Sequence, residues 1–334
     1  MTMKKIFFAI MVSTILVACS NPERREADIE GMDMQFGITR YDSLFWNIDS
    51  TRVNEEFQRL NRLCPEITPI YIEKVMLMGS IDSAQAAVEY KNFRKYPAVV
   101  DVYTSTQEAY KDISDIENEL KPALLRLRKF LPNLKLPKFY THISFFNQNI
   151  IIGEGFISLS LDNYMGEDYC FYDSIGIYSY LRRNMIREKI VSDYLTAILC
   201  SEFMSAPNGN LLDDMVYYGK MLYTVSCLLP DEKENVIMGY TDGQMKWAEE
   251  REEELWRQMV ESHIIYTENI IDKTKFLHDG PFTQPFGQDS PDRLGAYLGW
   301  QIVKSYMKNN QEVSIMQLMQ ETDGQKILKH SNYK

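Results

Sequence analysis

Residues 139–161 read FYTHISFFNQNIIIGEGFISLSL, and this stretch decides whether the chain is purely helical or mixed. Both of its halves, 139–146 and 150–161, are rich in aromatic and β-branched residues, which favour strands. The tripeptide Asn147–Asn149 separates the halves and is typical of a turn. The stretch therefore predicts two neighbouring strands joined by that turn, a β-hairpin.

Helical patterns surround this stretch on both sides. Apolar residues recur every three or four positions, as they do on the buried face of a helix. We expect helices over 51–63, 70–78 and 83–93, from a capping box at Thr104–Gln107 to Pro132, over 178–204, 211–229 and 242–265, after Ser290–Asp292, and after a second capping box at Ser314–Gln317. Residues 38–46 are expected to form a short strand or an extended entry.

The predicted fold class is α+β and mostly α-helical, with a small β-hairpin or sheet in the middle flanked by helices. One globular domain is expected over residues 37–334. A sub-division near residue 135 would separate a helical N-terminal part from an α+β C-terminal part.

The N-terminus has the features of a secretory signal. Lys4 and Lys5 precede an apolar run over 6–17, which is shorter than the roughly 20 residues that span a membrane. The run ends in Leu16-Val17-Ala18-Cys19, which resembles the lipobox of bacterial lipoproteins. We therefore expect residues 1–18 to be a signal peptide, with cleavage after Ala18 and lipid attached to the thiol of Cys19.

The mature chain is expected to be held on a membrane by this lipid, because two or three acyl chains anchor a protein stably. Ser20 follows the cysteine and favours the outer membrane, with the body facing the periplasm. The polar, charged residues that follow predict that 19–36 are a lipidated N-terminus and flexible tether.

Composition limits the partners of this chain. The formal charge is −11, and it becomes −13 once residues 1–18, with their two lysines, are removed. Such a charge argues against a nucleic-acid partner, since phosphate binding needs a basic face. Four cysteines besides Cys19 could form two disulfides, but the apolar surroundings of Cys200 and Cys227 favour buried free thiols.

Known catalytic motifs are missing from the sequence. It contains no HExxH, GxSxG, Walker loop or GxGxxG, so we expect no catalytic residues, no metal and no cofactor. The acidic run Glu249–Glu254 is interpreted as a solvated helix face, paired Lys246 to Glu250 and Glu253 to Arg257.

Two glycines one helical turn apart, Gly295 and Gly299, indicate close packing of one helix against a neighbour. Polar and aromatic residues near them, and in the loop that follows the predicted strands, could line a cleft or an interface. The candidate interaction residues are Asp162, Tyr164, Asp289, Arg293 and Tyr297.

Several segments together resemble the gliding-motility lipoprotein family GldB of the Bacteroidetes. The resemblance rests on 143–148, 157–166, 211–223, 238–241 with Trp247 and Trp256, 293–303 and 331–334, and it extends from about residue 38 to the end. It implies a lipid-anchored envelope protein needed for gliding and linked to the type IX secretion machinery. It assigns no catalytic residues that can be carried over to positions of this sequence.

The resulting expectation is a non-enzymatic envelope component that binds other envelope proteins. Two alternatives stay open: a peptidase-like hydrolase with an unrecognised site, and a lipoprotein that binds a peptide or small ligand. The order of strands and helices also looks like that of zincin metallopeptidases. In that case the chain would be a degenerate scaffold without metal ligands.

Overall fold

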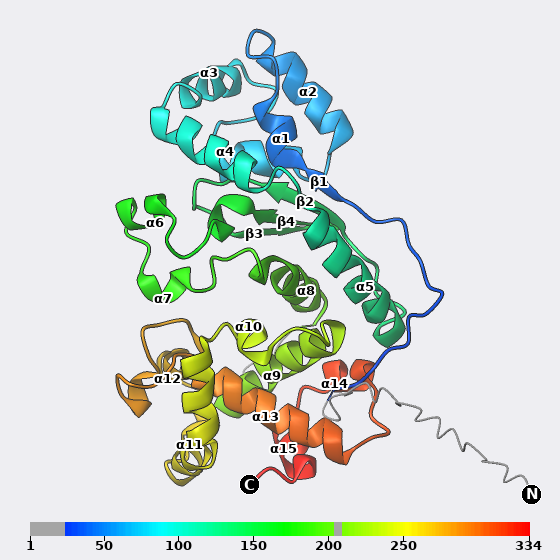
Figure 1. Cartoon of the computed structure of the whole chain (residues 1–334), viewed down its shortest axis with the longest axis vertical. Coiled ribbons are helices and arrows are strands. Elements are labelled where there is room, and N and C mark those ends of the chain that lie inside the picture. Colours follow the sequence, from blue (N-terminus) through cyan, green and yellow to red (C-terminus); the bar gives the residue numbers. More distant parts are fainter. Residues whose placement is uncertain (1–23, 204–208) are drawn as a thin grey trace, which may run out of the picture.

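The computed structural model describes residues 24–203 and 209–334. The predicted signal peptide, Ala18 and Cys19 lie outside the described residues. The chain forms two lobes stacked along the long axis, with a small sheet at the centre of the upper one (Figure 1). The predicted fold class, α+β and mostly helical, is confirmed.

Four strands form one mixed sheet in the order β1-β2-β4-β3. Their bounds are β1 (Ile38–Arg40), β2 (Lys138–His142), β3 (Ile150–Gly153) and β4 (Phe156–Ser160). β1 and β4 lie parallel to β2 on its two sides, and β3 is antiparallel to β4.

The predicted hairpin between 139–146 and 150–161 is therefore wrong. The second segment is itself a hairpin, because Gly155 turns the chain with a positive φ of 73° and sends β4 back along β3. β4 lies between β2 and β3 inside the sheet, and all five of its residues are buried. Residues 143–149 form a loop instead of extending the first strand.

Helices cover both faces of the sheet (Figure 1). On one side lie α1 (Tyr41–Trp46), α2 (Val53–Leu63), the π-helix η1 (Ile70–Val75), α3 (Ala84–Phe93) and α4 (Pro97–Ala109); on the other lie α5 (Ser114–Phe130) and α8 (Lys189–Glu202). Adjacent residues of β2 serve the two cores: Phe139 packs with α5 and α8, and Tyr140 packs with the first group.

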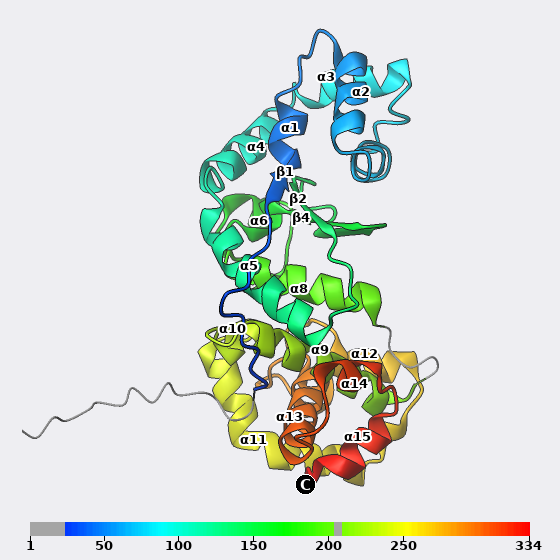
Figure 2. The same ribbon diagram turned by 90° about the vertical axis from the view of Figure 1, so that its right-hand side faces the viewer.

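The lower lobe is helical. It contains α9 (Leu211–Leu228), α10 (Glu234–Met238), α11 (Asp242–Glu261), α12 (Ile270–Leu277), α13 (Leu294–Asn309), α14 (Ile315–Gln320) and α15 (Gly324–Ser331), with short 3-10 turns η3 (Ile264–Tyr266) and η4 (Gln284–Phe286). Between the lobes run η2 (Leu161–Tyr164), α6 (Cys170–Ser174) and α7 (Ser179–Arg182). Figure 2 shows the two lobes from the side.

Helices α9 and α13 form the centre of the lower lobe and touch backbone to backbone. A Cβ on Gly299 would lie 1.8 Å from the carbonyl oxygen of Met215, and one on Gly219 would lie 2.3 Å from the carbonyl of Gly299. Gly295 instead faces the end of α12, where a Cβ would lie 3.0 Å from the Phe276 carbonyl. The predicted close approach of this helix to its neighbours is confirmed.

Two predicted helix starts are wrong. Thr104–Gln107 lies inside α4, and the expected helix from there to Pro132 is divided into α4 and α5 by residues 110–113. Ser290 does not cap α13, because its hydroxyl bonds to the carbonyls of Thr283 and Gly287. The N-cap is Arg293, whose positive φ of 51° marks the sharp entry into the helix.

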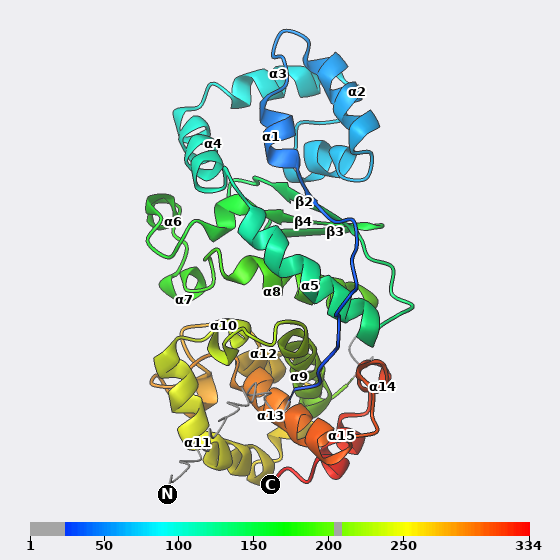
Figure 3. The same ribbon diagram turned by 45° about the vertical axis from the view of Figure 1, so that its right-hand side comes forward.

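Two further expectations change. Cys64, Cys170, Cys200 and Cys227 are free thiols, and Cys227 is buried as predicted, whereas Cys200 is exposed at the end of α8. Residues 24–36, predicted to be part of a flexible tether, run beside α5 down to the lower lobe (Figure 3), where Arg24 and Arg25 hydrogen-bond to the body.

Candidate functional site

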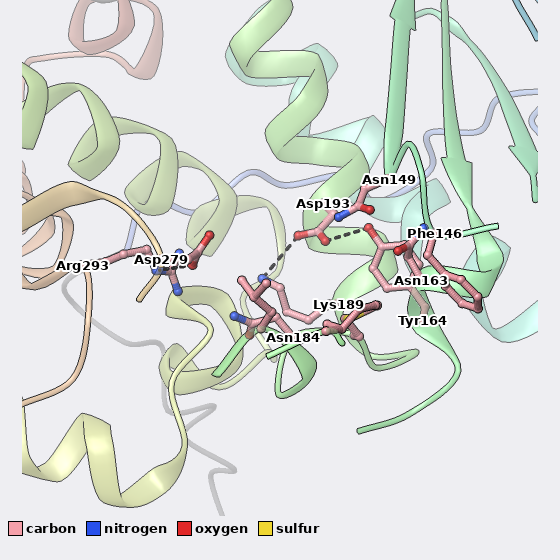
Figure 4. Close-up of a pocket in the computed structure, with 12 residues that line it drawn as sticks. Phe146, Asn149, Asn163, Tyr164, Asn184, Lys189, Asp193, Asp279 and Arg293 are labelled. Atoms are coloured by element: carbon pink, nitrogen blue, oxygen red, sulfur yellow. Dashed lines mark hydrogen bonds and ion pairs between the residues drawn. The ribbon is translucent and has the colours of Figure 1, made fainter. Parts of the chain in front are cut away.

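A cavity of about 370 Å³ lies between the two lobes, and a second of about 310 Å³ adjoins it. Both are lined by Lys189, Asp193, Asp279 and Arg293, so together they form one interlobe cleft. The first cavity is also lined by Phe146, Asn149, Asn163, Tyr164, Ile177, Leu181, Asn184 and Met185 (Figure 4).

One wall of the cleft carries a chain of paired polar groups. Lys189 and Asp193 are one turn apart on α8 and therefore share a face of that helix, with Nζ 3.4 Å from Oδ1. The hydroxyl of Tyr164 donates to Asp193 Oδ2 over 2.9 Å. Burial and the neighbouring Asp193 carboxylate raise the pKa of Tyr164 well above its ordinary value. Its hydroxyl therefore stays a protonated donor.

The opposite wall comes from the lower lobe. Arg293 donates to the carbonyl of Met238, and its Nε lies 3.1 Å from Asp279 Oδ1, an ion-pair distance without hydrogen-bond geometry. Gly239 lets this arginine approach, since a Cβ there would lie 2.7 Å from Arg293 Nη2 and from Asn184 Oδ1. The glycine thus places Arg293 and Asn184 side by side.

Three asparagines add uncharged donors and acceptors to the cleft. Asn149, Asn163 and Asn184 all line it. Asn163 is only 3% exposed, and its Nδ2 has no hydrogen-bond partner in the described chain. An unpaired buried donor costs about 1–3 kcal/mol, so a ligand acceptor reaching this group would recover that energy.

A buried ion pair fastens the two walls near the cleft. Arg183, directly after α7, holds both carboxylate oxygens of Asp292 at 2.7 Å and donates from Nε to the Gly239 carbonyl at 2.9 Å. Asp292 also accepts from the Gly280 amide. Because the two side chains are only 9% and 1% exposed, removing one partner of this clamp would leave the other charge buried without its counter-ion.

The predicted interaction residues do not form one set. Tyr164 and Arg293 line the cleft from opposite walls. Asp162 is fully buried beneath it and accepts from the amides of Ser144 and Phe146, which holds the 143–149 loop. Tyr297 is buried and donates to Glu252 Oε2, and Asp289 lies in an exposed loop.

The acidic run on α11 is only partly the solvated face that the sequence predicted. Glu250 pairs with Lys246, but Arg257 pairs with Glu254 rather than Glu253. Glu252 points inward and also accepts from the hydroxyl of Tyr333. This residue therefore has a structural role in joining α11 to α13 and the C-terminus.

Sequence reasoning missed Lys189, Asp193 and Asp279. The one available signal was a lysine and an aspartate four residues apart in the otherwise apolar segment of α8. Within residues 24–203 and 209–334, no group of three or more His, Cys, Asp or Glu side chains could hold a metal ion. A search of the same ranges for a membrane-spanning helix, which must combine sufficient length with an apolar sequence, finds none.

The fold and cleft define a two-lobed α+β protein whose lobes enclose a cleft lined by both charged and apolar side chains. The family model described as gliding motility protein GldB matches residues 22–334. The chain belongs to this family, as its sequence resemblance implied. No curated protein and no solved structure matches the chain, so the zincin-like layout stays a prediction.

Proposed function

We propose that this chain is a lipid-anchored component of the cell envelope that acts in gliding motility, together with the type IX secretion machinery, by binding another protein. It is held through Cys19 on the outer membrane and faces the periplasm. Membership of the GldB family over residues 22–334 supports the motility role. The binding role rests on the interlobe cleft.

The unpaired amide of Asn163 is the observation that carries the binding proposal. A peptide backbone alternates donors and acceptors, and the asparagine amides of the cleft offer both kinds of group. Phe146, Leu181 and Met185 supply apolar lining for side chains. An extended segment of another envelope protein is therefore the occupant that this cleft suits.

The charged groups of the cleft support binding without catalysis. A general acid or base must be within reach of its substrate. Here Asp193 is already bonded to Tyr164 and paired with Lys189, and Lys189 also donates to the carbonyls of Val236 and Ile237. Such internal pairing suits a fixed binding wall.

Site-specific photo-cross-linking in cells tests the binding proposal. A photoreactive residue at position 184, in the cleft, should capture a defined partner protein, whereas one at exposed Glu154 in the β3–β4 turn should not. Asn163→Leu, which removes the free donor at similar volume, should reduce capture from position 184. Identical products from both positions, unaffected by Asn163→Leu, would overturn binding in the cleft.

A further inference from the structure

The first described residues are fastened to the ends of the two central helices. Arg24 donates to the carbonyls of Leu229, Pro230 and Glu232, at 3.3, 2.7 and 3.3 Å from Nη1. These carbonyls directly follow the last turn of α9. Arg24 also lies 3.7 Å from the carboxylate of Glu234.

Arg25 does the same for α13. Its Nη2 donates to the carbonyls of Met307 and Asn310 at 3.1 and 2.9 Å, and to that of Val313 at 3.4 Å. Its Nη1 binds the side chain of Gln311, and its backbone amide lies 3.3 Å from Cys227 Sγ. Two consecutive arginines thus bind carbonyls at two helix ends: Arg24 binds those that directly follow α9, and Arg25 binds one in the last turn of α13 and two that follow it.

These contacts attach the chain to a rigid unit. The C-terminal end of a helix carries partial negative charge and unpaired carbonyls, which a guanidinium both neutralises and hydrogen-bonds. Helices α9 and α13 touch at Gly219 and Gly299, so their ends do not move independently. We call the surface around these ends, residues 229–232 and 310–313, the docking face.

Chain length then limits how far the docking face can lie from the lipid. Only five peptide units separate Cys19 from Arg24, and a fully extended chain spans at most about 3.6 Å per residue, or roughly 18 Å here. We propose that the docking face is turned toward the bilayer that holds the lipid. This inference rests on the lipidation of Cys19 proposed above.

The same orientation turns the cleft toward the periplasm. Figure 1 places the 24–37 segment on one side of the molecule, and α6, α7 and α12 on the other. The cleft is lined by Ile177 and Leu181 from the α6–α7 region and by Asp279, just after α12. Its mouth is therefore available to a partner in the periplasm while the docking face meets the lipid.

Quenching of thiol-bound fluorophores by lipid nitroxides tests this orientation. The full lipidated chain is reconstituted in phosphatidylethanolamine–phosphatidylglycerol vesicles that carry nitroxide headgroups. One reporter is Glu312→Cys on the docking face, with Cys170 and Cys200 changed to serine; the other is native Cys170 on α6, with Cys200 changed to serine. Position 312 should be quenched more strongly than position 170.

Two pairs of arginine substitutions test whether the contacts of Arg24 and Arg25 cause this difference in quenching. Arg24→Ala with Arg25→Ala should abolish the difference between the two reporters, because the body then swings on a free tether. Arg52→Ala with Arg59→Ala removes two exposed arginines elsewhere and should preserve the difference. Co-flotation with the vesicles is measured on the same samples.

The outcomes separate the orientation from the anchoring. A chain that floats with the vesicles but shows equal or reversed quenching would overturn the docking-face proposal and leave the lipid anchor intact. A chain that carries no lipid and does not float would overturn the anchor, and the orientation with it. Retention of the difference in the Arg24 and Arg25 variant would show that these contacts do not orient the body.

Discussion

At the scale of single residues, the buried His142 makes the stability of the protein depend on pH. It is fully buried in β2, with Nδ1 2.8 Å from Ser158 Oγ and Nε2 3.1 Å from the Gln148 carbonyl. Burial disfavours the charged imidazolium and lowers its pKa from 6.5 to about 4. The ring is therefore neutral in the folded protein at neutral pH.

The sign of the resulting pH dependence follows from this lowered pKa. Between pH 6.5 and about 4 the unfolded chain binds a proton at His142 that the folded chain does not, so stability falls as pH falls through this range. The full effect is roughly 3 kcal/mol. Urea unfolding at pH 7 and pH 4.5 should show a smaller acid loss for His142→Gln than for the unaltered protein. Equal losses would contradict this prediction.

Gly299 is the second residue at which the structure predicts a clear effect of substitution on stability. The carbonyl oxygen of Met215 occupies the space that a side chain would need, and this oxygen belongs to helix backbone that cannot turn aside. Gly299→Ala should therefore destabilise the protein by about 1–3 kcal/mol or more, and Gly299→Leu further, despite better helix propensity.

Gly243 in α11 is the matched control for this substitution. Its Cβ would meet nothing closer than 3.9 Å, so Gly243→Ala should leave stability unchanged or raise it by up to about 1 kcal/mol. Thermal unfolding of both variants checks the pair. A Gly299→Ala protein that melts at or above the melting temperature of the unaltered protein would show that α9 and α13 can move apart at little cost in free energy.

Some single residues allow a structural feature to be predicted from the sequence alone. Gly295 and Gly299 predicted close packing because glycine in a helix needs such a reason. The cleft residues gave no comparable signal, since Asp279 and Lys189 are 90 positions apart and only folding brings them to one cavity. Asp162 was selected from its sequence setting, yet its role is to hold a loop beneath the cleft.

At the scale of elements, strand existence was predictable and strand pairing was not. Residues 139–142 and 156–160 were expected to be extended, and they are. Their parallel pairing depends on which helices cover each face, which no local pattern encodes. For the same reason the sequence could not predict the pairing of β1 with β2, which lies about 100 residues away in the chain.

The Arg183–Asp292 clamp makes an element-scale prediction, because it joins the segment after α7 to the entry of α13. Arg183→Met should cost about 3–5 kcal/mol, since it leaves the Asp292 carboxylate buried and unpaired. The double variant with Asp292→Asn should lose less than the sum of the single variants. Urea unfolding of the four proteins measures this coupling.

An exposed pair is the control for the clamp. Arg52→Met, which breaks the solvent-exposed pair with Asp49, should cost between zero and about 1 kcal/mol. If Arg183→Met cost no more than Arg52→Met, the buried clamp would contribute no more to stability than a surface ion pair.

At the scale of the whole molecule, the first prediction concerns lipid attachment at Cys19. Cys19→Ala should abolish incorporation of a fatty-acid probe during metabolic labelling and leave the precursor uncut, because in the proposed lipidation the thiol is the nucleophile that acquires the lipid. Cys170→Ala, at an exposed cysteine, should retain the label. Label on the Cys19→Ala protein would contradict the proposed anchor.

The contacts of Arg24 also set an order of events in time. Their partners lie 205 to 208 residues further along the chain. In a chain exported with its N-terminus first, those partners emerge only after about two thirds of the protein has crossed. Until then the arginines have no carbonyls to bind, and under the proposed lipidation Cys19 would still be accessible to the enzymes that modify it. If Cys19 is lipidated as proposed, maturation of the anchor would therefore precede closure of the fold, and the N-terminal segment would be secured against the body last.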